Sequence, residues 1–419
     1  MLENVCLACL VGNGTPRIGR YSATGFAAAV GTVALSFTAT MSTAIQLTTS
    51  TLLVMGGTNN GTALNPAIQQ ELGGDPWYPA PNLDPFRSVG SFGNGYLDTH
   101  NNPRSPYFGW DFIPVAWPAD VLPSFLGKTP YEPSQQQGLH NIDTALGATL
   151  PTLGPGEKAV AFGYSSSANV MVREMRDLQS RTDTAPSADQ LEFFLLGNPN
   201  RPNGGILQRF AGAYIPLFDI PLDGSTPLDT PYATTDVSWE YDFFSDFPTY
   251  PLNLLAVLNA LLTGSIVHGN YFRATLDGPR ASPDTTVGAI TYITLETPHL
   301  PLLMPLYDIG FPAPLLDLVE PALTVMVDWG YDRSIGPGTP TMARLLPRID
   351  PVTATRDLIN AIGEGVRNSA ADLTPAAASQ PRPQIGRRTA PGGEANSYRA
   401  KNRQLRHSDP TERPHRISS

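Results

Sequence analysis

A serine-rich turn is the first segment of this chain whose residues could do chemistry. Residues 158–169 read KAVAFGYSSSAN, in which a short apolar run continues into a G-x-S-x-S pattern that begins at Gly163. A serine in a sharp turn between a strand and a helix exposes its hydroxyl as a nucleophile, and small neighbours let the strand and helix approach closely. The apolar run predicts the strand, and the helical spacing of apolar residues from Met171 to Leu178 predicts the helix. We therefore predict that Ser165 is a nucleophile.

Acyl transfer by a serine needs a base to take its proton and an acid to orient that base. In α/β hydrolases these groups follow in the order serine, acid, histidine, at the carboxyl edge of the sheet. Asp242 ends the predicted strand 234–242, and His299 follows the predicted strand 287–295. The order therefore predicts a triad of Ser165, Asp242 and His299.

Alternatives exist for both partners of the serine. His268 is a rival base, but it follows the predicted helix 252–266, where the helix dipole favours a protonated histidine in a structural role. Pro298 and Pro301 restrict the backbone on either side of His299, which suits a positioned base. The acid stays open among four residues. They are Asp242, Asp246, Asp236 and Asp219.

An early Gly-Gly-Thr turn could complete the oxyanion hole. The predicted strand 48–58 ends in Gly56, Gly57 and Thr58. An α/β hydrolase takes one oxyanion N–H from the residue after the nucleophile and another from an early strand-to-helix loop. Ser166 would supply the first and Gly57 or Thr58 the second, although a tight turn without a chemical role explains the glycines equally well.

The elements that must position these residues alternate between strands and helices. Helices are predicted over 134–146, 252–266, 314–330 and 351–367, between or after the apolar strands. This pattern predicts an α/β-hydrolase fold with a mainly parallel central sheet and helices on both faces. The long apolar and proline-rich connection 209–232 is a candidate lid or acyl-chain wall.

The two ends of the chain differ from its body. Residues 1–46 contain the apolar run Gly25–Phe37 after two arginines, which predicts an export signal or membrane anchor. Residues 47–371 form the predicted hydrolase domain, and residues 372–419 a disordered basic tail. We therefore expect a secreted protein or one anchored at the cell envelope.

Charge and cysteine usage exclude other classes of function. Of the formal net charge of −10, residues 373–419 carry +6 and the remainder carries −16. An acidic body argues against nucleic acid as the main partner. Cys6 and Cys9 form a C-x-x-C pair, but no second pair completes a zinc site. No metal or other cofactor is expected.

Several ordered strings resemble the PE-PPE domain of mycobacterial proteins, over roughly residues 50 to 345. They are GGT at Gly56–Thr58, FGYSSSA at Phe162–Ala168, LGNPNRPNGG at Leu196–Gly205, EYDFFSDFP at Glu240–Pro248, TPHLPLL at Thr297–Leu303 and GYDRSI at Gly330–Ile335. The resemblance implies a cutinase-like serine esterase without a metal, with Ser165, Asp242 and His299 at the triad positions and Thr58 in the oxyanion loop. Many family members carry an N-terminal PE or PPE module, and we expect the apolar segment to stand in its place here.

Three functions follow as hypotheses. The first is an exported esterase or lipase that cleaves fatty acyl esters through an acyl-enzyme. The second is a cell-envelope acyltransferase that moves fatty acyl groups between trehalose-type glycolipids, so that the partners would be a lipid or acyl-ester substrate and a glycolipid acceptor. The third is a non-catalytic envelope or host-interaction protein on a hydrolase scaffold.

Overall fold

The computed structural model describes residues 49–59, 61, 97, 99, 103, 105–126, 128–181, 183–273, 276, 278–347 and 349–373. The chain divides into two units, Met1–Leu47 and Thr48–Ser419, and every described residue belongs to the second. The predicted export segment and nearly all of the predicted tail lie outside the described residues. Both therefore stay predictions.

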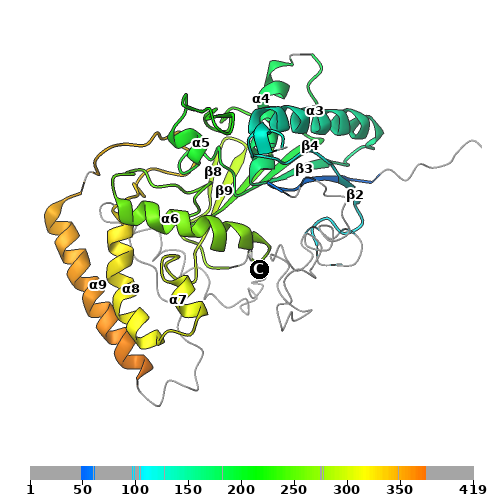
Figure 1. Cartoon of the computed structure of the whole chain (residues 1–419). Helices are drawn as coiled ribbons and strands as arrows, with labels where there is room; N and C mark the ends of the chain where they lie inside the picture. Colours follow the sequence, from blue (N-terminus) through cyan, green and yellow to red (C-terminus); the bar gives the residue numbers. More distant parts are fainter. Residues whose placement is uncertain are drawn as a thin grey trace, which may run out of the picture. The chain divides into compact units, whose positions relative to one another are not determined.

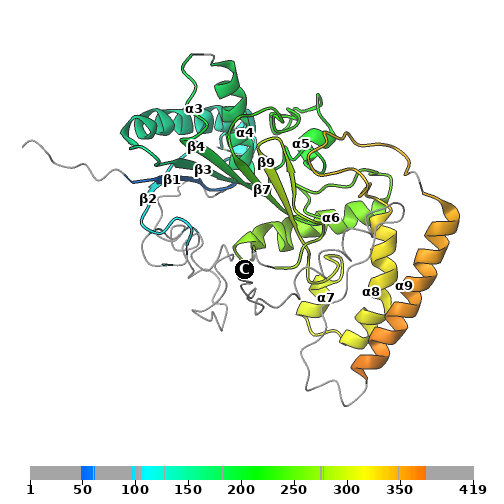
Figure 2. The same ribbon diagram turned by 180° about the vertical axis from the view of Figure 1, so that it is seen from behind.

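A seven-stranded sheet forms the centre of the second unit, as Figures 1 and 2 show from opposite sides. Its strand order is β2-β1-β3-β4-β7-β9-β8, and all pairings are parallel except that of the edge strand β8 with β9. The strands are β1 (Thr51–Met55), β2 (Asp111–Pro114), β3 (Ala159–Tyr164), β4 (Leu191–Leu196), β7 (Thr234–Trp239), β8 (Thr285–Val287) and β9 (Ile290–Leu295). A separate antiparallel hairpin joins β5 (Tyr214–Ile215) to β6 (Ile220–Pro221).

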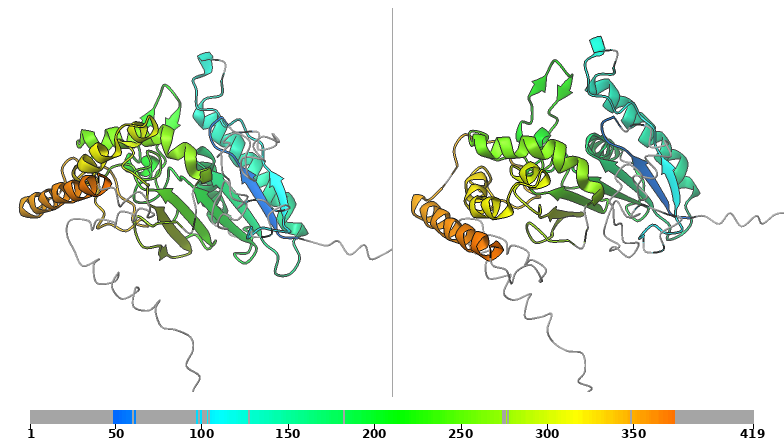
Figure 3. Two further views of the ribbon diagram at one scale, coloured as in Figure 1. Left: turned by 90° about the horizontal axis from the view of Figure 1, so that it is seen from below. Right: turned by 60° about the horizontal axis from the view of Figure 1, so that its bottom comes forward.

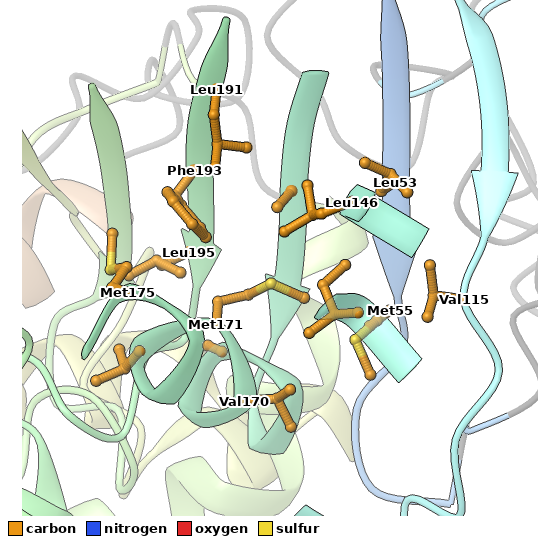
Figure 4. Packing of buried hydrophobic residues seen from close by; sticks show 14 of the residues in the cluster. Leu53, Met55, Val115, Leu146, Val170, Met171, Met175, Leu191, Phe193 and Leu195 are labelled. Carbon is orange, nitrogen blue, oxygen red and sulfur yellow. The ribbon is translucent and has the colours of Figure 1, made fainter. Parts of the chain in front are cut away.

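The central strands are apolar because both of their faces are covered. Every residue of β1 and β3 is buried. On one face, Leu53, Met55 and Phe193 pack against apolar side chains of two helices, as Figure 4 shows. On the other face, Phe162 and Phe194 lie in a second cluster.

The helices surround this sheet and extend beyond its β9 side. They are α3 (Tyr131–Thr149), α4 (Ser166–Ser180), α5 (Ile206–Arg209), α6 (Leu254–Ile266), α7 (Met304–Asp308), α8 (Ala313–Asp328) and α9 (Pro351–Asp372), with the short 3-10 helices η2 (Ser124–Leu126), η3 (Leu150–Thr152) and η4 (His268–Arg273). Helices α3 and α4 cover the first face, and Tyr271 of η4 packs into the cluster on the second. Helices α8 and α9 lie side by side, as both views of Figure 3 show.

The predicted fold class is confirmed: the chain is an α/β protein with a mostly parallel sheet and helices around it. The predicted strands and helices form, with two differences: the predicted strand 287–295 is divided between the end of β8 and β9, and β7 ends at Trp239, so that Asp242 lies in the turn after it. The last helix runs to Asp372, beyond its predicted end at Arg367, and the predicted lid segment 209–232 contains the β5–β6 hairpin. Among the described residues, no helix combines the length and apolar character needed to cross a membrane.

Candidate active site

The turn after β3 has the geometry of a nucleophile elbow. Ser165 lies between β3 and the first residue of α4, with φ 58° and ψ −118°. A side-chain-bearing residue at positive φ stores strain, which persists only where the surrounding structure holds it. The strain turns the chain sharply from strand to helix and leaves Ser165 partly exposed at the carboxyl edge of the sheet.

Two neighbours of Ser165 explain the small residues of the motif. A Cβ atom at Gly163 would lie 2.7 Å from Cγ of Met171 and 2.7 Å from the carbonyl oxygen of Ser167, so only glycine permits this approach of strand and helix. The hydroxyl of Ser167 is buried, accepts the N–H of Tyr164 at 2.8 Å and contacts the carbonyl oxygen of Met55 at 2.8 Å. The final serine of G-x-S-x-S therefore ties the elbow to β1.

The hydroxyl of Ser165 meets a histidine, and that histidine is His268. Nε2 of His268 lies 2.7 Å from Oγ of Ser165. On the other side of the ring, Nδ1 lies 2.7 Å from Oδ2 and 3.0 Å from Oδ1 of Asp242. The three side chains thus form a hydrogen-bonded series from the Ser165 hydroxyl through the His268 ring to the Asp242 carboxylate, which is the arrangement that acyl transfer by a serine needs.

Asp242 is fully buried and held by donors on both oxygens. Besides His268, the hydroxyl of Tyr271 donates to Oδ2 at 2.6 Å, and the N–H of Phe244 donates to Oδ1 at 2.8 Å. Burial by itself raises the pKa of Asp242, but the nearby His268 ring and these hydrogen bonds outweigh burial and hold the pKa below its usual range. The ionised carboxylate can therefore fix the His268 ring with Nδ1–H toward Asp242 and Nε2 toward Ser165.

This lowered pKa also links the site to folding. A carboxyl whose pKa is lower in the folded chain stabilises the fold above its unfolded pKa of about 3.9, and that contribution is lost as the pH falls through the folded value. Asp242 therefore contributes to stability at neutral pH, and this contribution is lost below pH about 3.9.

Aromatic rings set the position of His268. Its ring stacks on Tyr164 with centroids 5.4 Å apart and lies 4.4 Å from the ring of Phe244. The Tyr164 hydroxyl also donates to the carbonyl oxygen of His268 at 2.5 Å. Gly197, directly after β4, has φ 62°, and a Cβ there would lie 2.8 Å from Cε1 of His268. Gly197 therefore makes room for the imidazole.

We expect Gly197→Ala to impair the site, because the added methyl group pushes on the imidazole and strains a left-handed backbone. A displacement on the order of 1 Å can lower turnover by about 100-fold, and the backbone strain costs about 1 to 3 kcal/mol. Ester hydrolysis and urea unfolding measure the two effects. The matched control is Gly147→Ala in α3, where a Cβ meets nothing within 4 Å, and it should leave both unchanged or slightly raise stability. Equal behaviour of the two variants would show that the space at Gly197 is unimportant.

His299, the predicted base, lies in a different set of contacts. Its Nδ1 is 3.2 Å from Oε2 of Glu320, and its ring stacks on Tyr307 with centroids 3.8 Å apart. Glu320 also accepts the N–H of Leu300 at 2.5 Å, so this cluster ties the segment after β9 to α8. The structure thus puts His268 in the place that the sequence prediction gave to His299, because the chain after β9 leads toward α7 and α8.

The structure distinguishes the four candidate acids by their partners. Asp242 is the one of the four that contacts His268. Asp236 pairs with Arg201 in the core, and Asp246 accepts from Arg333 and from the N–H of Tyr241. Asp219 accepts from Tyr214 in the β5–β6 hairpin. The choice of Asp242 therefore agrees with the geometry.

The predicted oxyanion loop lies against the nucleophile turn. A Cβ at Gly57 would lie 3.2 Å from Cβ of Ser165, and the Thr58 hydroxyl donates to Oγ of Ser166 at 2.9 Å. Trp117 holds this loop, since its Nε1–H donates to the carbonyl oxygen of Gly56 at 3.0 Å. Ser166 is the first residue of α4, where helix N–H groups have no acceptor within the helix. The structure thus brings Gly57, Thr58 and Ser166 together beside Ser165.

Both partners of Ser165 come from one connection of the chain. Asp242 and His268 lie between β7 and β9, separated by α6, whereas the sequence prediction placed the acid and the base after different strands. Because the serine-acid-histidine order is the same for His268 and His299, order alone could not choose between them. His268 was an alternative candidate in the sequence analysis, but no feature of the neighbouring sequence indicated that it, and not His299, lies beside Ser165.

The parallel sheet, the strained serine turn and the buried histidine–aspartate pair define a cutinase-like α/β protein. Comparison with known families agrees, since the PE-PPE domain matches residues 109–332, a range that contains Ser165, Asp242 and His268. The chain belongs to the PE-PPE domain family.

Relatives with curated names include enzymes of two kinds. The chain is 42% identical to Esterase PE16 of Mycobacterium tuberculosis over 267 residues, which are 61% of this chain and 49% of that protein. It is 30% identical to the Diacyltrehalose acyltransferase Chp2 of the same organism over 309 residues, 70% of this chain and 80% of that protein. It is 31% identical to the SL1278 acyltransferase Chp1 over 53% of this chain and 54% of that protein. The chain spans about half the length of the first of these relatives.

Proposed function

We propose that this protein is a serine esterase that cleaves fatty acyl esters through an acyl-enzyme on Ser165. The observation that carries the proposal is the series of contacts from Oγ of Ser165 through the His268 ring to buried Asp242. Membership in a family that includes an esterase and acyltransferases supports the same chemistry.

In the first half-reaction, Nε2 of His268 takes the proton of Ser165 while Oγ attacks the carbonyl carbon of the ester. The negative charge that develops on the carbonyl oxygen needs N–H donors aimed at it. We assign this role to the N–H of Ser166, at the first turn of α4, and to an N–H of Gly57 or Thr58, because these residues lie beside Ser165. The imidazolium then gives its proton to the leaving alkoxide, and the acyl group stays on Ser165.

In the second half-reaction, His268 removes a proton from an acceptor hydroxyl, which attacks the acyl-enzyme and regenerates Ser165. Asp242 stays ionised throughout, because its buried hydrogen bonds favour the charged form. If the acceptor is water, the outcome is hydrolysis. If it is a sugar hydroxyl, the outcome is acyl transfer.

Exposed apolar residues on the helix that precedes the proposed base support a lipid substrate. Helix α6, which leads into His268, exposes Leu254, Leu258 and Leu261, with exposed fractions of 75%, 48% and 53%. Several exposed leucines on one helix are typical of a surface that contacts apolar ligands or membranes. We place the acyl chain of the substrate along this side of the site.

Acyl transfer to a trehalose-type glycolipid is the second candidate, and one observation favours it. The chain covers 80% of the acyltransferase Chp2 but 49% of Esterase PE16. Incubating the acylated protein with a trehalose glycolipid and measuring transfer against hydrolysis separates the two functions. Export to the cell envelope, proposed from residues 1–46, would place either activity near such lipids.

A covalent probe tests the proposed chemistry directly. We expect a fluorophosphonate to label the wild-type protein on Ser165, and we expect Ser165→Ala to show neither labelling nor hydrolysis of p-nitrophenyl acyl esters. Ser180→Ala, a serine at the exposed end of α4, is the matched control and should behave like the wild type. A folded wild-type protein that the probe does not label would instead support a non-catalytic scaffold.

A further inference from the structure

A second cluster of ionisable groups lies between α3 and α4, outside the residues assigned to ester chemistry. Asp143 comes from α3, and Glu174 and Asp177 come from α4. One carboxylate oxygen from each lies within 4.8 Å of the other two. Glu174 is nine residues beyond Ser165, which corresponds to about 13 Å along the helix axis.

Glu174 is unusual within this cluster. Its side chain has an exposed fraction of 0%, and neither of its carboxylate oxygens has a hydrogen-bond partner among the described residues. An ionised carboxylate in such a place costs several kcal/mol, on the order of 3 to 5, unless a cation or hydrogen-bond donors compensate it.

A cavity adjoins the unpartnered carboxylate. It has a volume of about 300 Å³ and is lined by Asp143, Glu174 and Arg181, with Leu146, Leu178 and Gln190 among its other walls. This volume accommodates several water molecules, each of which occupies about 30 Å³ in the liquid. The cavity therefore has room for an ion together with part of its hydration shell.

Charge balance indicates the charge of the ligand. Arg181 is the cation that the structure places in the cluster: its Nη2 lies 2.7 Å from Oδ1 of Asp143, and its Nε lies 3.0 Å from Oδ2 of Asp177. Arg181 makes no hydrogen bond to Glu174 in the described structure. With Glu174 ionised, three carboxylates and one guanidinium leave a formal charge of −2, which a divalent cation neutralises.

We propose that Asp143, Glu174 and Asp177 bind a hard divalent cation, Ca²⁺ or Mg²⁺, that joins α3 to α4. Carboxylate oxygens and water are the ligands that these ions prefer, at about 2.3 to 2.6 Å for Ca²⁺ and about 2.0 to 2.1 Å for Mg²⁺. Two ligands of one Ca²⁺ ion are at most about 4.8 Å apart, and the three carboxylate oxygens lie within 4.8 Å of one another.

The ion in this site is structural and takes no part in the proposed ester chemistry. It links two helices that cover the same face of the sheet, and α4 carries Ser165 at its other end. A ligand that binds only the folded state raises the melting temperature with its concentration. Binding should therefore appear as a stabilisation that depends on the ion.

The test uses the full chain after treatment with EDTA and removal of the chelator. Calorimetric titration with CaCl₂ and separately with MgCl₂ should show one ion per chain for at least one of them, and the melting temperature should rise with that ion. NaCl at equal ionic strength should not reproduce the rise. The comparison of the two chlorides identifies the preferred ion.

Variants locate the binding residues. Glu174→Gln should abolish the rise in melting temperature that the ion causes. The same substitution also removes a buried unpaired acid, so the melting temperature without ion can change independently. Asp177→Asn, at a more exposed position, provides a second variant if Glu174→Gln does not fold. Asp111→Asn removes an exposed carboxylate of β2 and should respond like the wild type, and so should Ser165→Ala.

The proposal is overturned if neither chloride binds to or stabilises the wild-type chain. It is equally overturned if Glu174→Gln and Asp177→Asn keep the full response, because the ion would then bind elsewhere. Loss of the response in Ser165→Ala would also contradict it, since the site would then belong to the catalytic residues.

Discussion

Replacing His268 with alanine is expected to lower kcat for ester hydrolysis by about 10⁴-fold or more. The reason is the 2.7 Å contact between its Nε2 and Oγ of Ser165, without which no described base is placed to take the serine proton. A loss of 10⁴-fold corresponds to about 5.5 kcal/mol of transition-state stabilisation. Steady-state kinetics with a p-nitrophenyl ester, together with the rate of fluorophosphonate labelling, measure it.

His299→Ala is the matched control for this experiment. It removes one hydrogen bond to Glu320 and the stack on Tyr307. We expect a loss of about 1 kcal/mol in the free energy of unfolding, with kcat within a few-fold of the wild type. Circular dichroism of both variants verifies that they are folded. If His299→Ala abolished activity while His268→Ala kept it, the base would be His299 and the assignment of His268 would be wrong.

Arg201→Met is expected to destabilise the fold far more than the loss of a surface ion pair or of a single hydrogen bond. Arg201 and Asp236 are both buried, and their ion pair joins Nη1 to Oδ1 at 2.6 Å. Nη2 of Arg201 also donates to the Thr294 hydroxyl at 2.8 Å, so one side chain links the turn after β4 to β7 and β9. Burial already raises the pKa of Asp236, in opposition to Arg201 and to the hydrogen bond from Asn198.

Removing Arg201 alone leaves the Asp236 carboxylate buried without its cation. The expected cost is about 3 to 5 kcal/mol, which is a large share of the ordinary stability of a folded protein, about 5 to 15 kcal/mol. Urea unfolding followed by circular dichroism gives the free energy.

Two comparisons make this measurement specific. The double variant Arg201→Met with Asp236→Leu should recover much of the loss, because it removes both charges. Arg280→Met breaks the more exposed pair with Asp284, where the expected cost is below about 1 kcal/mol. Equal costs for Arg201→Met and Arg280→Met would show that burial of the first pair has no energetic consequence.

Local sequence predicted the main strands, the main helices and the sharp turn at Ser165. Apolar runs such as Ala159 to Phe162 are continuous because parallel strands are covered on both faces, and helical spacing after Ser165 predicted α4. Gly163 was also interpretable from the local sequence, because the strand and the helix that contact each other at this position are separated by only a few residues, and the contact leaves no space for a side chain. These features can be recognised in the sequence because the residues that produce them are close together in the chain.

Tertiary structure decided which histidine faces Ser165. His268 and His299 both follow Asp242 in the chain. The prolines beside His299 restrict its backbone, but they do not indicate where in the fold the side chain lies. The site at His268 depends on Tyr164, Phe244 and Gly197, which surround the imidazole from three separate segments. The burial of the Glu174 carboxylate also could not be predicted from the sequence, because it depends on contacts between separate segments. Its surroundings come from α3, α4 and the chain after α4, which only folding brings together.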